Sequence, residues 1–177
     1  MRLSSILPAS VAVLALSCGV ASAKETPIGT PIKQSAMEIS SVYLQPIEME
    51  PAGMMLAADK ADVHLETDIH AMAGNPNGFA DGEWVAGLNV KYVVTKLDSG
   101  QKVSGKYMPM VANDGPHYGD NVKLFGAGKY RLTLTISPPG MNFGRHVDKE
   151  TGVGPWFKAF TVSEDFTYLG NGKKGGY

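Results

Sequence analysis

The clearest pattern in this chain is an alternation of apolar and polar residues over residues 61–71, ADVHLETDIHA. Apolar side chains take most of the odd positions, and the even positions from 64 to 70 carry His64, Glu66, Asp68 and His70. Because successive side chains of a strand point to opposite faces, the pattern predicts a β-strand with one face in an apolar core and the other carrying imidazoles and carboxylates. The alternative interpretation is a solvated outer face of an antiparallel sheet.

Other runs of alternating, β-branched or aromatic residues predict about seven strands, separated by turns rich in Gly, Pro and Asn. These strands are expected at residues 37–47, 61–71, 84–97, 102–111, 122–124, 130–136 and 156–162. Extended or loop structure is expected at residues 24–35, 112–121 and 141–155. A glycine turn followed by Tyr130 is similar to the tyrosine corner of immunoglobulin-like domains. We therefore expect an all-β fold, an immunoglobulin-like antiparallel β-sandwich.

The first 23 residues have the layout of a cleaved secretory signal. Arg2 precedes an apolar run, which ends in the small residues of Ala21-Ser22-Ala23. Lipid attachment at Cys18 is the second interpretation. The expected organisation is a signal peptide at residues 1–23, a β-sandwich metal-binding domain at 24–169 and a flexible glycine-rich tail at 170–177. No later stretch approaches the roughly 20 apolar residues of a membrane span, so an integral membrane protein is not expected.

Composition removes several classes of function. The single cysteine, Cys18, leaves with the signal, which excludes disulfides, thiol nucleophiles, zinc–thiolate sites and blue-copper sites in the mature chain. Removing 23 of the 177 residues leaves 154, enough for one domain with its own core. Loss of Arg2 changes the net charge from −1 to −2. A charge so near neutral gives no reason to expect nucleic acid or anionic lipid as a partner.

Strand geometry restricts which histidines of residues 61–71 can share an ion. His64 and His70 are six residues apart, which is roughly 20 Å on a regular strand, whereas His64 and Glu66 are about 7 Å apart on one face. His64 and Glu66 can therefore bind one ion, or two neighbouring ions, and His70 cannot join them.

A second group of metal-binding residue types follows the predicted strand at 102–111. Met110 ends that strand, Asp114 lies in an Asp-Gly turn, and His117 follows it. Imidazole with thioether and no thiolate suits copper, especially Cu(I), whereas carboxylates such as Glu66 and Asp114 suit iron or another hard cation. The alternatives remain open: methionine is commonly a core filler, His117 can cap a turn, and His146 can be a surface residue of a polar loop.

Three blocks carry a resemblance to a known family: DVHLETDIHA, KYMPMVANDGPHYGDNVKLFGAGKYRLTLTI and RHVDKETGVGPWF. With the signal, they resemble the periplasmic iron-transport accessory proteins of the FetP-like family over nearly all of the mature chain. The resemblance implies a homodimeric immunoglobulin-like sandwich that binds copper and iron near the subunit interface. It implies that the copper site consists of His64, Met110, His117 and His146, and that Glu66 and Asp114 form or flank a second, harder site.

The resemblance gives other residues smaller roles. Asp68 and His70 match the family block but are expected to be structural or to lie outside the ligand set, and Glu25 in the lead-in could reach the second site. The expected cofactors are copper and iron, as the resemblance implies. The spacing of the residues does not show which subunit supplies His146.

The functional hypothesis is a periplasmic metal-binding protein that supports iron uptake and delivers iron to an inner-membrane permease. No catalytic residue is predicted, and copper-assisted redox turnover stays open. A periplasmic copper carrier or buffer is the alternative, and a β-sandwich interaction module without metal is a third possibility. A copper–zinc dismutase does not fit, because that chemistry needs more than the four histidines of this chain.

Overall fold

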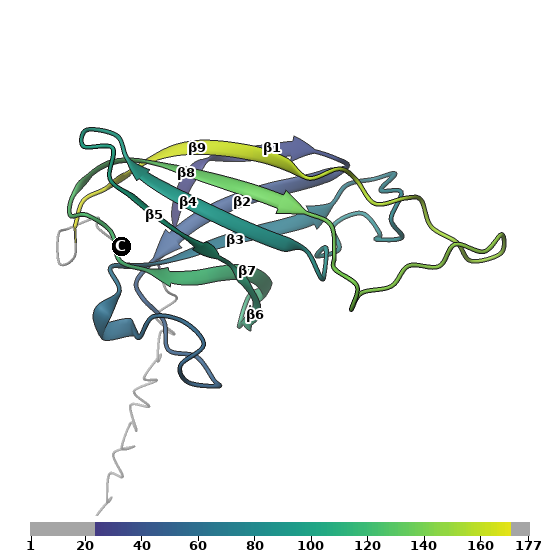
Figure 1. The fold of residues 1–177 in the computed structure, drawn as a ribbon, viewed down its shortest axis with the longest axis horizontal. Helices are drawn as coiled ribbons and strands as arrows, with labels where there is room; N and C mark the ends of the chain where they lie inside the picture. The colour runs from purple at the N-terminus through teal and green to yellow at the C-terminus, as the bar shows by residue number, and fades with distance from the viewer. Residues whose placement is uncertain (1–23, 171–177) are drawn as a thin grey trace, which may run out of the picture.

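The protein, described by a computed structural model over residues 24–170, is a sandwich of two antiparallel β-sheets (Figure 1). The five-stranded sheet has the order β1 (Thr26–Gln34), β2 (Met37–Leu44), β3 (Val63–Ala71), β7 (Gly115–Val122) and β6 (Met108–Ala112). The four-stranded sheet has the order β5 (Lys102–Lys106), β4 (Asn89–Lys96), β8 (Gly128–Ser137) and β9 (Phe160–Tyr168). A short 3-10 helix, η1, covers Ala58–Lys60. The predicted fold class is confirmed, whereas the predicted signal at 1–23 and residues 171–177 of the predicted tail lie outside the described residues.

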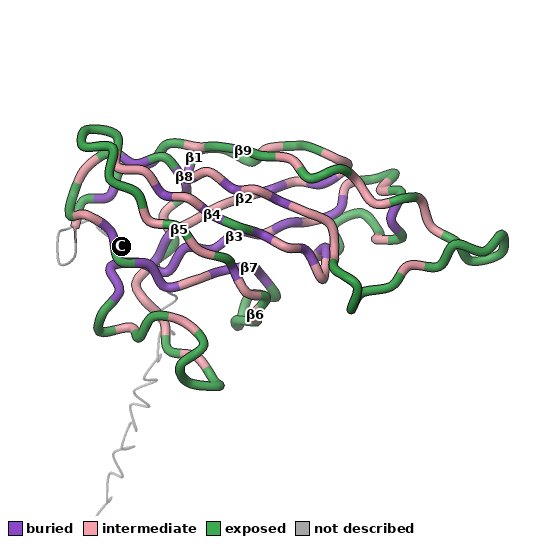
Figure 2. Tube along the Cα trace, in the orientation of Figure 1, coloured by how far each residue is buried: buried purple, intermediate pink, exposed green. Residues whose placement is uncertain are grey.

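The core lies between the two sheets, where Figure 2 shows buried stretches in both layers. Val63, Leu65 and Ile69 of β3 are completely buried, as the alternation predicts. Burying each such side chain contributes about 1.5–3 kcal/mol. Tyr130 at the start of β8 forms the predicted tyrosine corner, since its hydroxyl accepts a hydrogen bond from the Phe125 N–H and donates one to the Gly126 carbonyl.

The prediction of an extended lead-in at residues 24–35 is wrong in part, because most of these residues form β1. This strand pairs with β2 and buries Ile28. Its two prolines are compatible with a strand because β1 is at the edge of its sheet, where one row of N–H groups needs no partner. Pairing is irregular between Ile28 and Ile32, next to Gly29 at a φ of 65°.

The region from 102 to 122 differs most from the prediction. The single strand expected at 102–111 is two strands, β5 and β6, which belong to different sheets and are separated by Tyr107 alone. The tight loop expected at 112–121 is mostly β7, which places His117 within a sheet. The last strand, β9, begins at Phe160, four residues later than expected.

The two ends of the sandwich carry different loops (Figure 1). Residues 138–159 project from one end, whereas the loop formed by residues 45–57, called the 45–57 loop here, lies with η1 below β3 and β7 near the other. Among residues 24–170 no helix has the length and apolar character needed to cross a membrane.

Candidate metal centre

Two neighbouring strands bring the central residues of the candidate site together. In the pairing of β3 with β7, His64 lies opposite Asn121 and Glu66 lies opposite Gly119, so these residues share a face with His117. One ligand atom from each of His64, Glu66 and His117 lies within 4.8 Å of the others. All three are buried, with exposed fractions of 1%, 6% and 3%. The predicted convergence of His64, Glu66 and His117 therefore occurs within one chain.

The buried side chain of Asn121 fixes the proton on the His64 ring. Its Nδ2 donates hydrogen bonds of 2.9 and 2.8 Å to the carbonyls of Ile47 and Leu56. The amide oxygen must therefore be the atom that lies 3.1 Å from His64 Nδ1. Because that oxygen can only accept a hydrogen bond, Nδ1 carries the proton and Nε2 presents its lone pair.

That lone pair lies in a space kept open by a glycine. A Cβ added at Gly119 would lie 2.6 Å from His64 Nε2 and 2.9 Å from the Leu65 carbonyl oxygen, so no larger residue fits without movement. His64 Nε2 and both ring nitrogens of His117 are buried and form no hydrogen bond of normal geometry. An unsatisfied buried polar atom typically costs about 1–3 kcal/mol. A bound cation would remove that cost, so the orphaned nitrogens fit a metal site.

Burial also keeps both rings in the form that binds metals. It lowers the pKa of His64 to about 4 against the raising effect of Asn121, and it lowers the pKa of His117 against the raising effects of Asp68 and Asp114. The rings meet edge to face with centroids 5.9 Å apart, and His117 Nδ1 lies 3.3 Å from Glu66 Oε1. Near neutral pH both imidazoles are uncharged, as metal ligation requires.

Met110 is the thioether that the structure adds to this group. It is half-buried on β6, directly opposite His117 of β7. Residues opposite each other in an antiparallel pair have Cβ atoms about 4.5–5.5 Å apart. The pairing therefore puts Met110 on the same face as the imidazole of His117, and its role as a copper ligand stays a prediction.

Carboxylates gather on the other side of Glu66. A cavity of about 140 Å³ is lined by Glu25, Glu66, Asp68, His70, Asp114, Gly115 and Pro116. A second cavity of about 140 Å³ shares Glu25, Glu66 and Asp114 with it and continues to His64 and His117. Glu66 therefore separates an imidazole compartment from a carboxylate compartment.

The charges of this compartment repel one another. Burial, then Asp68, Glu25 and Asp114, raise the pKa of Glu66 to about 8. Burial, then Asp114, raises the pKa of Glu25, and burial is also the main cause of the raised pKa of Asp68. Acids that resist ionisation together favour either protons or a cation between them, which fits a site for a hard metal ion.

Two histidines lie outside the central group: His146, which was predicted as a ligand, and His70, which was predicted not to be one. His146 is in the 138–159 loop, where its side chain is 74% exposed and Nδ1 lies 2.7 Å from the Thr151 hydroxyl. His70 lines the carboxylate cavity and not the imidazole cavity, in agreement with the strand spacing. Sequence reasoning missed Asn121 and Gly119, because no motif marks Asn121 and the residues of β7 do not alternate between buried and exposed.

This chain is similar in sequence and in fold to other proteins. The model of a family described as Fe2+ transport protein matches residues 22–170. This chain belongs to the Fe2+ transport protein family. A UPF0423 protein of Brucella abortus is 62% identical over 168 residues, which cover 93% of this chain and 92% of the relative.

Two solved structures from this family are similar in fold and sequence. FetP of uropathogenic Escherichia coli strain F11 has a TM-score of 0.80 and 54% identity, covering 83% of this chain and 97% of FetP. A copper-bound variant of Campylobacter jejuni P19 has a TM-score of 0.82 and 52% identity, covering 85% of this chain and all of the P19 chain. The predicted resemblance to FetP-like proteins is confirmed.

Proposed function

We propose that this protein is a periplasmic metal-binding protein of high-affinity iron uptake, which binds copper and iron and delivers iron to an inner-membrane permease. The observation that carries the proposal is the buried group of His64, Glu66 and His117, whose unpaired nitrogens face a carboxylate. Membership of the Fe2+ transport protein family and the copper-bound state of the similar P19 structures support the choice of metals. The periplasmic location rests on the pattern of residues 1–23.

In this proposal the copper ligands are His64, Met110 and His117, with His146 supplied by a second copy of the chain in a homodimer. The exposure of His146 and the projection of its loop, residues 138–159, from one end of the sandwich (Figure 1) support a contribution between subunits. The same loop exposes Met141 completely and Val147 to 73%. Apolar side chains on a projecting loop are suited to contact with another protein surface.

Iron is the cargo and binds at the carboxylate compartment through Glu66 and Asp114, beside Glu25 and Asp68. Oxygen donors suit iron better than they suit Cu(I). Asn121 holds His64 in the metal-binding tautomer and also bonds two carbonyls of the 45–57 loop. Copper bound to the imidazoles would supply a one-electron redox centre next to the iron.

Titration of the mature protein with Cu(I) and Fe(II), each against a competing chelator, tests the ligands. We expect His64→Ala and Met110→Ala to lose at least tenfold in copper affinity, and Met72→Leu, a matched methionine outside the site, to bind as wild type does. The assignment fails if His64→Ala and Met110→Ala bind both metals normally.

Mixing two variants that each lack one copper ligand tests which subunit supplies His146. Neither the His146→Ala protein nor the His64→Ala protein contains a complete copper site. A mixed dimer regains one complete site if His146 crosses the interface, and regains none if each chain supplies its own. Recovery of one copper equivalent per mixed dimer is the expected result.

A periplasmic copper carrier or buffer is the second candidate, because the imidazole and thioether ligands are complete without the carboxylates. The two functions separate in a deletion strain. Impaired growth under iron limitation, restored by the wild-type protein and not by Asp114→Asn, supports iron delivery. Sensitivity only to copper excess supports the copper carrier.

A further inference from the structure

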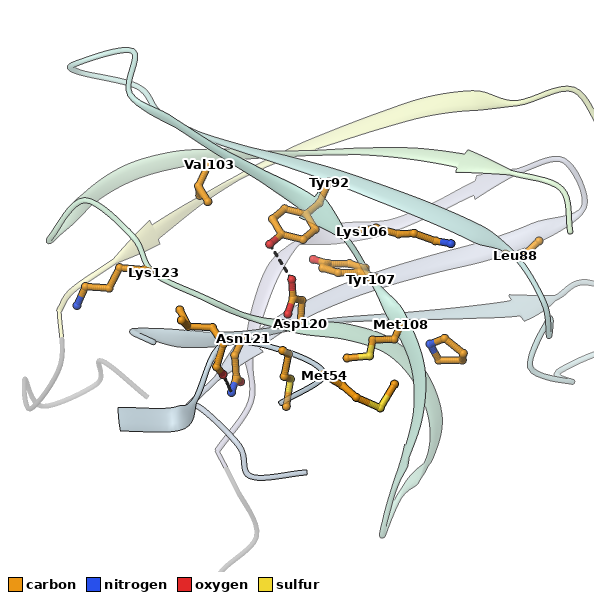
Figure 3. A pocket seen from close by; sticks show the side chains of 13 residues that line it. Met54, Leu88, Tyr92, Val103, Lys106, Tyr107, Met108, Asp120, Asn121 and Lys123 are labelled. Carbon is orange, nitrogen blue, oxygen red and sulfur yellow. Dashed lines mark hydrogen bonds between the residues drawn. The ribbon is translucent and has the colours of Figure 1, made fainter. Parts of the chain in front are cut away.

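Besides the two cavities of the candidate metal centre, a larger cavity lies where the chain passes from one sheet to the other (Figure 3). It has a volume of about 540 Å³. Strands β6 and β7 pair only as far as Met108 and Gly119, whereas the Tyr107 N–H already donates to the carbonyl of Val90 in β4 of the other sheet. The divergence of the strands leaves an opening at the edge of the sandwich, and the 45–57 loop lies beside it.

Three methionines from two separate elements line this opening: Met54 and Met55 of the 45–57 loop, and Met108 of β6. We call this cavity the methionine pocket. Met54 is 56% exposed and neither Met55 nor Met108 is fully buried, in contrast to Met37 of the core at 1%. Methionine used as core filler is expected to be buried. Thioethers that are exposed, as in Met54, or half-buried, as in Met55 and Met108, are instead available as ligands around this cavity.

The charged groups of the methionine pocket are largely engaged. Asp120 accepts a hydrogen bond of 2.8 Å from the Tyr92 hydroxyl, and Lys123 lies 2.8 Å from Asp62. The exposed Lys106 remains on the rim. Its positive charge repels a divalent cation twice as strongly as a monovalent one. Thioether sulfur also prefers soft ions, above all Cu(I), so charge and ligand type favour the same ion.

The methionine pocket shares a wall with the candidate metal centre. Met108 lies opposite Gly119, and His64 Nε2 occupies the space that a side chain of residue 119 would fill. Asn121 lines the pocket and bonds His64, and it also bonds the carbonyls of Ile47 and Leu56 in the loop that carries Met54 and Met55. The loop is therefore fixed in place against the His64 ring.

We propose that Met54, Met55 and Met108 form a second soft-metal site, which captures Cu(I) beside the imidazole centre. Methionine side chains have three rotatable bonds, so the thioethers can close on an ion from their positions around the cavity. This inference deepens the proposed function, because it gives Cu(I) a binding site next to His64. The methionine site itself does not require the histidines.

Silver titration of mature protein labelled with ¹³C at the methionine methyl groups tests the proposal, with Ag(I) as a diamagnetic soft-metal probe. We expect the methyl signals of Met54, Met55 and Met108 to shift at low equivalents. Met72 lines neither the methionine pocket nor the cavity of His64 and His117, so it serves as the control for indiscriminate binding, and its signal should not move. Shifts in Met110 alone would overturn the proposal.

Two variants separate the sites. The triple variant Met54→Leu, Met55→Leu, Met108→Leu keeps apolar volume and should lose one Ag(I) equivalent, whereas Met72→Leu should lose none. In the double variant His64→Ala, His117→Ala, the three pocket signals should still shift while the response of Met110 is lost. If the triple variant binds as many ions as wild type, the methionine site does not exist. If Met110 never responds while the pocket does, the proposed histidine site fails and the methionine site stands.

Discussion

Replacing Glu66 with glutamine should change how the stability of the metal-free protein depends on pH. The carboxyl is 6% exposed, and burial and neighbouring acids raise its pKa from 4.5 to about 8. Between these values the folded protein keeps a proton that the unfolded chain has released. The resulting stabilisation is complete below pH 4.5 and is lost as the pH rises through 8.

Because one proton is worth about 1.4 kcal/mol per pH unit, Glu66 should lower the free energy of unfolding by about 1.5 kcal/mol between pH 6.5 and pH 8. His64 and His117 have the opposite effect on the free energy of unfolding. Their pKa values are lowered from 6.5 in the folded protein, so their contribution to this free energy increases as the pH rises to 6.5. The double difference between two proteins and two pH values removes the histidine contribution. Glutamine resembles the protonated acid, so Glu66→Gln should abolish the Glu66 contribution.

Urea unfolding of metal-free protein at pH 6.5 and 8 measures this quantity. The change in unfolding free energy between the two pH values should differ by about 1.5 kcal/mol between wild type and Glu66→Gln. Glu150→Gln, on an exposed loop, should match wild type. Equal pH dependence in wild type and Glu66→Gln would refute the electrostatic account of the carboxylate compartment.

Three other substitutions test individual contacts. Asn121→Ala should lower copper affinity about 10- to 100-fold by releasing the His64 ring, and should lower stability by about 1–3 kcal/mol through two unsatisfied carbonyls; Gln101→Ala, in the exposed β4–β5 turn, is the control. Gly119→Ala should displace His64 and weaken copper binding in a chelator competition, and unchanged affinity would contradict the close approach. Tyr130→Phe should lower the unfolding free energy by about 1–2 kcal/mol with copper binding intact, and loss of binding would show that the corner is not purely structural.

Strand alternation predicted the core strand and its ligands well. The period of two places His64 and Glu66 on one face wherever β3 lies, because this relation is local to the strand. Met110 and His117 were expected to meet through a loop. They meet as a cross-strand pair instead, which requires pairing information that the sequence pattern does not contain.

The missed strands contain residues that normally favour turns. In β7, Gly115, Pro116 and Gly119 obscure the alternation, and the polar Asp120 lies on the apolar side. Its position is stabilised by the Tyr92 hydroxyl from the other sheet. Such compensation depends on tertiary packing, so propensity alone could not have revealed it. The change from one sheet to the other at Tyr107, between β5 and β6, likewise depends on tertiary packing and not on local propensity.

Local sequence also cannot locate polar residues that act through others. Asn121 has no motif that marks it, and its role follows only from its bonds to His64 and to two carbonyls of the 45–57 loop. His146 shows the complementary limit, because within one chain it is exposed and is not part of the group of His64, Glu66 and His117.

Anomalous diffraction from crystals of the mature protein loaded with copper and iron would test the central claim most directly. Data collected at the absorption edge of each metal distinguish the two ions. The account predicts a copper peak bounded by His64, Met110 and His117, completed by His146 of a second subunit, and an iron peak among Glu66, Asp114 and the neighbouring acids. Copper bound elsewhere, with the buried nitrogens of His64 and His117 left without a metal, would contradict it.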